Sequence, residues 1–117
     1  LHLVDELYAP EIHFEDPFHD IHGIDELRRY FENLYDGVES CKFDFQEELV
    51  NGNHAALRWT MNLRHRRFKH LIQVPGCTFI QFGEKVQYHR DYFDAGKLLY
   101  ENVPLLGGVI RTIKARL

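Results

Sequence analysis

The stretch EDPF at residues 15–18 is the part of this chain that says most about its fold. It ends a short segment in which Ile12 and Phe14 alternate with charged and polar residues, as in a half-buried strand. A second carboxylate in a similar setting is Asp91, within HRDYFD at residues 89–94. Because an ionised group is costly to bury among aromatic rings, two such placements predict a pocket that handles a small molecule.

The segments on either side of EDPF predict two helices. Residues 3–8 read as the end of a helix that is stopped by the following proline. Residues 18–23 predict a loop, after which Asp25 is a good N-cap candidate because its carboxylate can accept from free amides. Apolar residues then recur at steps of three and four through Tyr35, which predicts an amphipathic helix that Gly37 ends.

Most of the remaining chain alternates apolar and polar residues with a period of two, which predicts strands. An Asn-Gly-Asn turn at residues 51–53 separates the first two strands. Pro75-Gly76 predicts a bulge or bend in the third. Helices followed by a run of antiparallel strands are typical of an α+β fold. The predicted strands include residues 43–46, 54–63, 72–82 and 86–93.

The size and composition indicate a single globular domain, residues 1–117. The net charge of −4 argues against bulk nucleic-acid binding, because such domains carry a basic footprint. No apolar run approaches about 18 residues, so no transmembrane segment is expected. Cys41 and Cys77 form neither a CxxC motif nor a disulfide framework, which favours reduced cysteines in a cytoplasmic protein. Since the chain opens at Leu1 rather than Met, we expect it to lack most of its first helix.

The C-terminal tail, residues 98–117, combines apolar side chains with three basic ones. It predicts one or two short helices broken at Pro104 and at Gly107-Gly108. Such helices would pack on the domain itself or across a dimer interface, and binding to a membrane surface is the alternative.

Asp16 is the first candidate catalytic residue. It lies between Phe14 and Phe18, which we expect to line the binding site, and it precedes a proline that fixes the local backbone. Burial among rings would raise its pKa toward the range useful for removing a proton next to a carbonyl. The alternative is a loop aspartate that caps backbone amides ahead of the helix.

His89, Asp91 and Phe93 share one face of the last predicted strand, because side chains alternate along a strand. An imidazole beside a carboxylate can act as an acid–base pair near neutral pH. Alternatively, the two side chains only satisfy each other on the sheet. Arg58 could orient Asp91 or clamp an anion, although a solvent-facing arginine is more common on a strand.

Neither a metal nor a cofactor is expected. His19 and His22 flank Asp20, but a metal site needs at least one more convergent ligand and a rigid frame. The sequence has no glycine-rich phosphate loop and no Ser-His-Asp ordering.

The order of YAP at residues 8–10, EDPF, IHG at residues 21–23, an amphipathic helix, four strands and RDYFD at residues 90–94 resembles a known group of proteins. This group is the nuclear-transport-factor-2-like superfamily, which includes ketosteroid isomerase, limonene epoxide hydrolase and the SnoaL-like polyketide cyclases. The resemblance implies a cone-shaped, cystatin-like roll, in which helices pack on a strongly curved mixed antiparallel sheet around a deep pocket. The fold hosts enzymes and binding modules alike, so it does not decide the function.

The resemblance also assigns individual residues. Asp16 matches the general base that ketosteroid isomerases carry in an Asp-Pro-Phe element, whereas their buried acid donor falls at Thr78. Asp91 matches the first aspartate of the ending found in limonene epoxide hydrolase, whose partner arginine corresponds to Arg58. The second aspartate of that enzyme falls at Thr60, which makes epoxide hydrolysis the less expected reaction. An acid within the cone, as in SnoaL-type cyclases, is available in either aspartate.

We therefore expect a cofactor-free isomerase or cyclase that uses Asp16 and Asp91 as acid–base groups on a small apolar or carbonyl-bearing molecule. His89 and Arg58 would assist, and Thr78 would contribute to binding. The rival interpretation is a non-catalytic dimeric module of the same fold that binds a ligand or a protein. An open pocket with both aspartates on its wall favours ligand chemistry, whereas a filled cone favours the rival. A homodimer is expected in either case.

Overall fold

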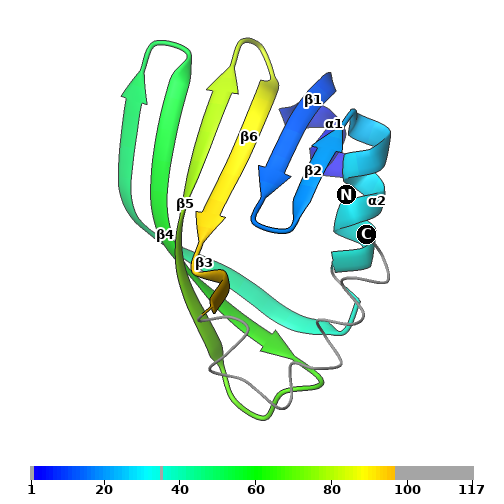
Figure 1. Cartoon of the computed structure of the whole chain (residues 1–117), viewed down its shortest axis with the longest axis vertical. Helices are drawn as coiled ribbons and strands as arrows, with labels where there is room; N and C mark the ends of the chain where they lie inside the picture. The colour runs from blue at the N-terminus through cyan, green and yellow to red at the C-terminus, as the bar shows by residue number, and fades with distance from the viewer. Residues whose placement is uncertain (1, 35, 97–117) are drawn as a thin grey trace.

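The computed structural model describes residues 2–34 and 36–96, in which two helices accompany one six-stranded sheet. The strand order is β2-β1-β6-β5-β4-β3. The sheet is strongly bent, and α2 packs on β1 and β2 (Figure 1). The elements are α1 (His2–Leu7), β1 (Tyr8–Asp16), β2 (His19–His22), α2 (Ile24–Leu34), β3 (Val38–Asn51), β4 (His54–His65), β5 (Ile72–Phe82) and β6 (Val86–Phe93).

The sheet is mixed. β1 pairs antiparallel with β2 and parallel with β6, and the remaining pairs are antiparallel. The predicted α+β fold with helices on a curved mixed sheet is confirmed. Period-two patterning over residues 54–63 and 86–93 also predicted β4 and β6 closely, because side chains alternate between the two faces of the sheet along each strand.

Residues 19–22, predicted as loop, instead form the edge strand β2. Ile21 lies opposite Phe14 in the antiparallel register and is buried, so one apolar contact fixes a strand too short to show a pattern. β1 also starts earlier than predicted, at Tyr8, because Tyr8 already pairs with Val86 of β6.

The start of α2 also differs from the prediction, because the cap lies two residues earlier in the sequence. Gly23, not Asp25, takes the capping position: its φ is 91°, and its carbonyl accepts from the amide of Leu27 at 3.1 Å. The amide of Gly23 donates to the carbonyl of Ile12 at 2.8 Å, which ties the start of α2 to β1. Glycine adopts this positive φ without steric cost, so it suits this junction.

The core lies between α1, α2, β1 and β2. Its buried members are Val4, Ile12, Phe14, Ile21 and Leu27, with Leu27 fully buried on the apolar stripe predicted for α2. This cluster anchors β1, and through it the concave face of the sheet, against α2.

Of the predicted bulge or bend at Pro75-Gly76, the bulge is wrong, because β5 pairs with β4 without a break there. Pro75 lies beyond the end of the β5–β6 ladder, which begins at Gly76 opposite Phe93. Pro75 has no amide hydrogen to donate, and on the β6 side no described strand is paired with it. Proline is tolerated there, as it is at the edge of a sheet. Gly76 is required for another reason: it lies opposite Trp59, whose ring covers it.

We expect Gly76→Ala to lower the free energy of unfolding by about 1–3 kcal/mol, the usual cost of overpacking. A Cβ at this position would lie 2.6 Å from Cζ3 and 2.8 Å from Cζ2 of Trp59, so the indole would have to move. Urea denaturation measures the effect. Gly83→Ala is the matched control, because its Cβ would meet only the side-chain amide of Gln87 at 3.5 Å. Equal destabilisation by the two variants would contradict the explanation.

Three other sequence expectations concern the chain more broadly. The helices predicted within residues 98–117 lie outside the described residues. Of the helices that the structure describes, none has the length and apolar character needed to cross a membrane. Cys41 and Cys77 are both free thiols, as predicted, and burial raises the pKa of Cys41.

Candidate functional site

The concave side of the sheet holds a cavity of about 1040 Å³, closed on one side by α2. Side chains from β4, β5 and β6 that point to this side form one wall, because alternate residues of a strand share a face. Both predicted catalytic aspartates, Asp16 and Asp91, lie on the wall of this cavity. The predicted site residues Phe14, Phe18, Thr78, His89 and Phe93 line it as well.

Asp91 is held by two donors. The antiparallel register places Thr78 of β5 directly opposite Asp91 of β6, and His89 lies two residues earlier on the same face. Oδ1 of Asp91 accepts from Oγ1 of Thr78 at 2.6 Å and from Nε2 of His89 at 2.7 Å. No side chain or amide in the described part of the chain hydrogen-bonds Oδ2 of Asp91, which leaves that oxygen available to a ligand.

The hydrogen bonds of Asp91 continue into a chain of five side chains. Nε1 of Trp59 donates to Oγ1 of Thr78 at 2.8 Å, so the threonine hydroxyl hydrogen is directed to Asp91. At the other end, the hydroxyl of Tyr8 lies 3.0 Å from Nδ1 of His89. If the single ring proton of His89 is on Nε2 and is donated to Asp91, then Nδ1 is an acceptor, and the hydroxyl of Tyr8 donates to it.

Asp16, at the end of β1, is buried with 6% of its surface exposed. Its Oδ1 accepts from the amide of Phe18 at 2.8 Å and from Nδ1 of His19 at 3.0 Å. Its Oδ2 accepts from the hydroxyl of Tyr30 at 2.7 Å. Asp16 therefore joins the β1–β2 turn to α2, a role close to the capping alternative left open by the sequence.

The pKa of Asp16 moves in the direction opposite to the sequence expectation. Burial by itself raises this pKa, but the hydrogen bonds from His19, Tyr30 and the Phe18 amide together outweigh burial and hold it below 3.8. The expected rise is wrong because two of the neighbouring rings carry hydrogen-bond donors that favour the charged form. Asp16 is thus an ionised anchor with both oxygens occupied, which makes it a poor proton acceptor.

We expect Asp16→Asn to lower the free energy of unfolding by about 1–3 kcal/mol at pH 7, because it removes a charged acceptor from buried donors. A lowered folded-state pKa gives stability that is present above pH 3.8 and is lost as the pH falls through the folded value. The gap between wild type and variant should therefore be widest above about pH 5 and close in strong acid.

Urea denaturation at a series of pH values measures this gap. Glu84→Gln, at an exposed turn, is the control and should change stability by less than about 0.5 kcal/mol. A gap for Asp16→Asn that widens toward low pH would contradict the assignment.

Arg58 is the one predicted site residue that the structure does not bring to the cavity. Period-two alternation turns Trp59 inward and Arg58 outward, where its Nε donates to Oε1 of Glu47 at 3.2 Å. Its side chain is exposed, so the solvent-facing alternative holds. Arg58 lines only a shallow depression of about 460 Å³ on the convex face.

Four residues that complete the site were not predicted to belong to it: Tyr8, His19, Tyr30 and Trp59. Tyr30 and Trp59 do lie on the predicted apolar faces of α2 and β4. A buried tyrosine or tryptophan finds a partner for its polar atom, which is the signal that could have identified these two.

A family profile described as a SnoaL-like domain matches residues 1–89 of the chain. Among curated proteins, none matches. Solved structures share the fold at low sequence identity. A hypothetical protein with a ketosteroid isomerase-like fold from Catenulispora acidiphila, in complex with trimethylamine, is 16% identical with a TM-score of 0.73, covering 80% of this chain and 74% of its own.

Two candidate polyketide cyclases have the same fold. The one from Acidithiobacillus ferrooxidans is 17% identical with a TM-score of 0.75, covering 86% of this chain and 80% of its own. The SnoaL-like one from Shewanella putrefaciens is 16% identical with a TM-score of 0.71, and the match covers 83% of this chain and 82% of its own. At these identities the structural likeness shows the fold alone.

Proposed function

The chain belongs to the SnoaL-like domain family, and we propose that it binds a small apolar or carbonyl-bearing molecule in its cavity and transfers a proton on it without a cofactor. The observation that carries this proposal is the arrangement of Asp91. One carboxylate oxygen is fixed by Thr78 and His89, the other has no hydrogen-bond donor among the described residues, and Asp91 lines the cavity. A carboxylate so placed can accept a proton from a bound molecule.

The size and lining of the cavity support a ligand rather than a filled cone. Its volume of about 1040 Å³ is at the upper end of ordinary ligand sites, which span roughly 300–1,000 Å³. Most of its lining is apolar. Polar groups line it from β1, β5 and β6, and charged side chains of α2 and of residues 65–67 line it as well. Such a site suits a molecule with an apolar body and one or two carbonyl groups.

We assign separate roles to the two aspartates. Asp91 removes a proton from a carbon next to a carbonyl, and the electron pair moves onto the carbonyl oxygen to form an enolate. The proton returns to another carbon in an isomerisation, or the enolate carbon attacks a second carbonyl in an aldol-type cyclisation. His89, which is hydrogen-bonded to both Asp91 and Tyr8, relays protons. Asp16 stays ionised and keeps the β1–β2 turn in place.

A non-catalytic dimeric binding module is the second candidate, and the convex face favours it. Leu49, Ala56 and Phe79 are neighbours across β3, β4 and β5 on this face, and Leu49 and Phe79 are exposed. An exposed apolar row of this kind suits a second copy of the chain. A homodimer is compatible with both candidates, and light scattering after size-exclusion chromatography measures it.

Hydrogen–deuterium exchange next to a carbonyl tests the proposal without knowledge of the natural substrate. A panel of apolar ketones and diketones is incubated with the full chain in D₂O, and loss of the α-proton signal is followed by NMR. We expect catalysed exchange of at least one compound. Leu57→Trp, which fills the cavity beside Thr78, should abolish it, whereas Arg58→Ala on the opposite face should not. Binding without exchange would favour the second candidate, and exchange unaffected by Leu57→Trp would contradict the proposed site.

A further inference from the structure

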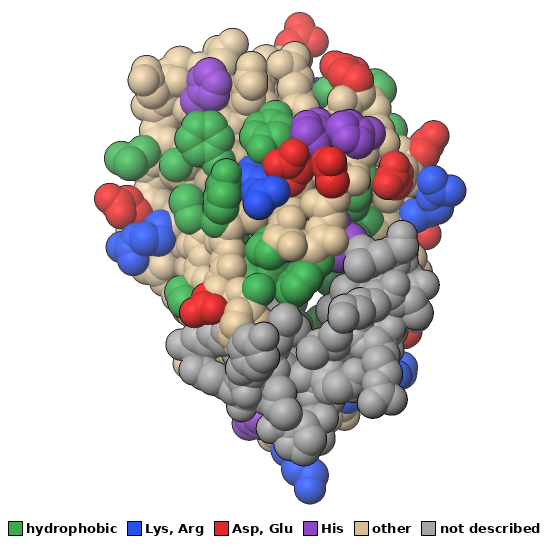
Figure 2. All heavy atoms as spheres, viewed as in Figure 1, with side chains coloured by type: hydrophobic (Ala, Val, Ile, Leu, Met, Phe, Trp, Pro, Cys, Tyr) green, Lys and Arg blue, Asp and Glu red, His purple; other side chains and the backbone are tan. Residues whose placement is uncertain are grey.

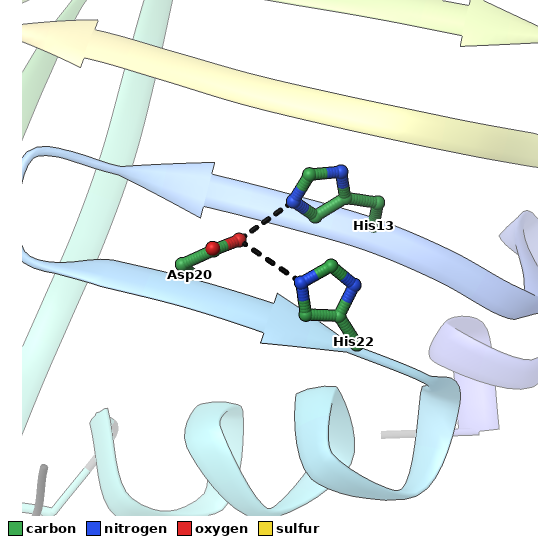
Figure 3. A group of neighbouring side chains, drawn as sticks. All are labelled: His13, Asp20 and His22. Atoms are coloured by element: carbon green, nitrogen blue, oxygen red, sulfur yellow. Dashed lines mark hydrogen bonds and ion pairs between the residues drawn. The ribbon is translucent and has the colours of Figure 1, made fainter.

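The convex face of the β1–β2 hairpin carries two histidines and two carboxylates at the corners of a square. In the antiparallel register His13 lies opposite His22, and Glu15 lies opposite Asp20. Residues two apart on a strand share a face, so all four side chains project from the same side. Figure 3 shows His13 and His22 converging on Asp20, and Figure 2 shows histidine and acidic side chains gathered over these two strands.

The potential ligand atoms of this cluster lie close together. Nε2 of His13 is 2.6 Å from Oδ1 of Asp20 and 3.0 Å from Oε1 of Glu15. Nε2 of His22 is 3.4 Å from the same oxygen of Asp20. Zinc holds such atoms at about 2.0–2.2 Å, which separates tetrahedral ligands by roughly 3.3 Å. The observed separations lie around this value, so small side-chain rotations bring the atoms to coordinating distance.

Two side chains outside the cluster hold the carboxylate of Glu15 in place. Its Oε2 accepts from the hydroxyl of Tyr88 and from Nη1 of Arg90, each at 3.0 Å. These contacts leave Oε1 directed at His13. Support of this kind, in which a carboxylate is oriented by its own hydrogen bonds, is typical of metal ligands.

The two imidazole rings also favour a cation. Their centroids are 4.2 Å apart with planes at 16°, and both Nε2 atoms face Asp20. One divalent ion placed beside Asp20 could therefore reach the Nε2 atoms of both rings. We infer that His13, Asp20 and His22 bind a divalent transition metal, with Glu15 beside His13 as a candidate further ligand, and that zinc fits this nitrogen and oxygen donor set best.

The cluster lies mostly outside the cavity: Asp20 is in the cavity lining, but His13, Glu15 and His22 are not. Alternation along β2 turns the side chain of His19 toward Asp16 and those of Asp20 and His22 to the other face. The sequence argument against a metal considered His19 and His22 together, but the structure places them on opposite faces and supplies His13 instead. The inference therefore does not depend on the proposed proton transfer.

Zinc titration by calorimetry, on the full chain without a histidine tag and after treatment with a chelator, tests the site. We expect one zinc ion per chain, and at least a tenfold weaker affinity for His22→Gln. The side chain of His22 is 68% exposed, so this variant should keep its fold. His54→Gln removes an exposed histidine of β4 outside the cluster and should leave the affinity unchanged.

Cobalt(II) provides a second readout, because its visible absorption is strong only in low-symmetry sites such as a tetrahedral one. We expect these bands in wild type and their loss in His13→Gln and in Asp20→Asn, with circular dichroism confirming that both variants fold. Absence of zinc binding by the wild type would overturn the inference. Equal zinc affinity of wild type and His22→Gln would overturn it as well.

Discussion

Phe14→Ala should lower the free energy of unfolding by about 3–5 kcal/mol, the range for removing a buried phenylalanine ring. Phe14 is 2% exposed, and its ring centroid lies 4.7 Å from that of His89. It also contacts the rings of Tyr30 and Phe31 on α2, at 5.4 Å and 5.9 Å. The variant thus opens a void where β1, β6 and α2 meet, and backbone shifts can close it only in part.

Urea denaturation measures this loss, and Phe45→Ala provides the matched control. Phe45 is 63% exposed at the cavity wall, so its truncation removes little buried surface and should cost less than about 1.5 kcal/mol. Similar losses in the two variants would show that Phe14 does not occupy the packed centre described above.

Asp91→Asn should lower the rate of α-proton exchange by about 10²–10⁴-fold, the usual contribution of a positioned general base. The asparagine keeps the shape of Asp91 and an oxygen that can accept from Thr78 and His89. It cannot take up a proton at neutral pH, so the fold should remain while the reaction stops. Exchange followed by NMR, alongside thermal unfolding of each variant, separates the two effects.

Asp16→Asn is the comparison that distinguishes the two aspartates. If Asp16 is an anchor with both oxygens occupied, its variant should lose stability but keep exchange within about tenfold of wild type, well short of the loss of a general base. Loss of exchange in a folded Asp16→Asn, with Asp91→Asn still active, would reverse the roles assigned here.

The sequence predicted the elements whose apolar pattern is long enough to read. In β4 the alternation of apolar and polar residues is clear over ten residues, and the spacing of Leu27 and Phe31 indicated which side of α2 packs on the sheet. β2 was missed because four residues cannot show a period, and because its pairing depends on the contact between Ile21 and Phe14. Fold class follows from several patterns at once, whereas a short edge strand depends on a single contact.

The candidate site was predictable only in part. Alternation correctly grouped His89 and Asp91, because both residues lie on one strand. The lowered pKa of Asp16 was not predictable, since it depends on hydrogen bonds from His19 and Tyr30 that only the folded chain brings together, and Tyr30 lies fourteen residues away on a helix. Arg58 was misplaced because the family resemblance outweighed its alternation with Trp59, which on its own indicates the outer face.

The position of β1 between β2 and β6 has a consequence for the order in which this molecule assembles. A nascent chain can complete the β3–β4–β5 meander early, from neighbouring segments, but β1 has no partner on one side until Val86–Phe93 has been synthesised. The bond between Tyr8 and His89 closes a loop of 81 residues, and such distant closure is slow. The β1–β2 hairpin can therefore join the sheet only after β6 has been synthesised. The cavity is complete only once β6 has paired with both β1 and β5.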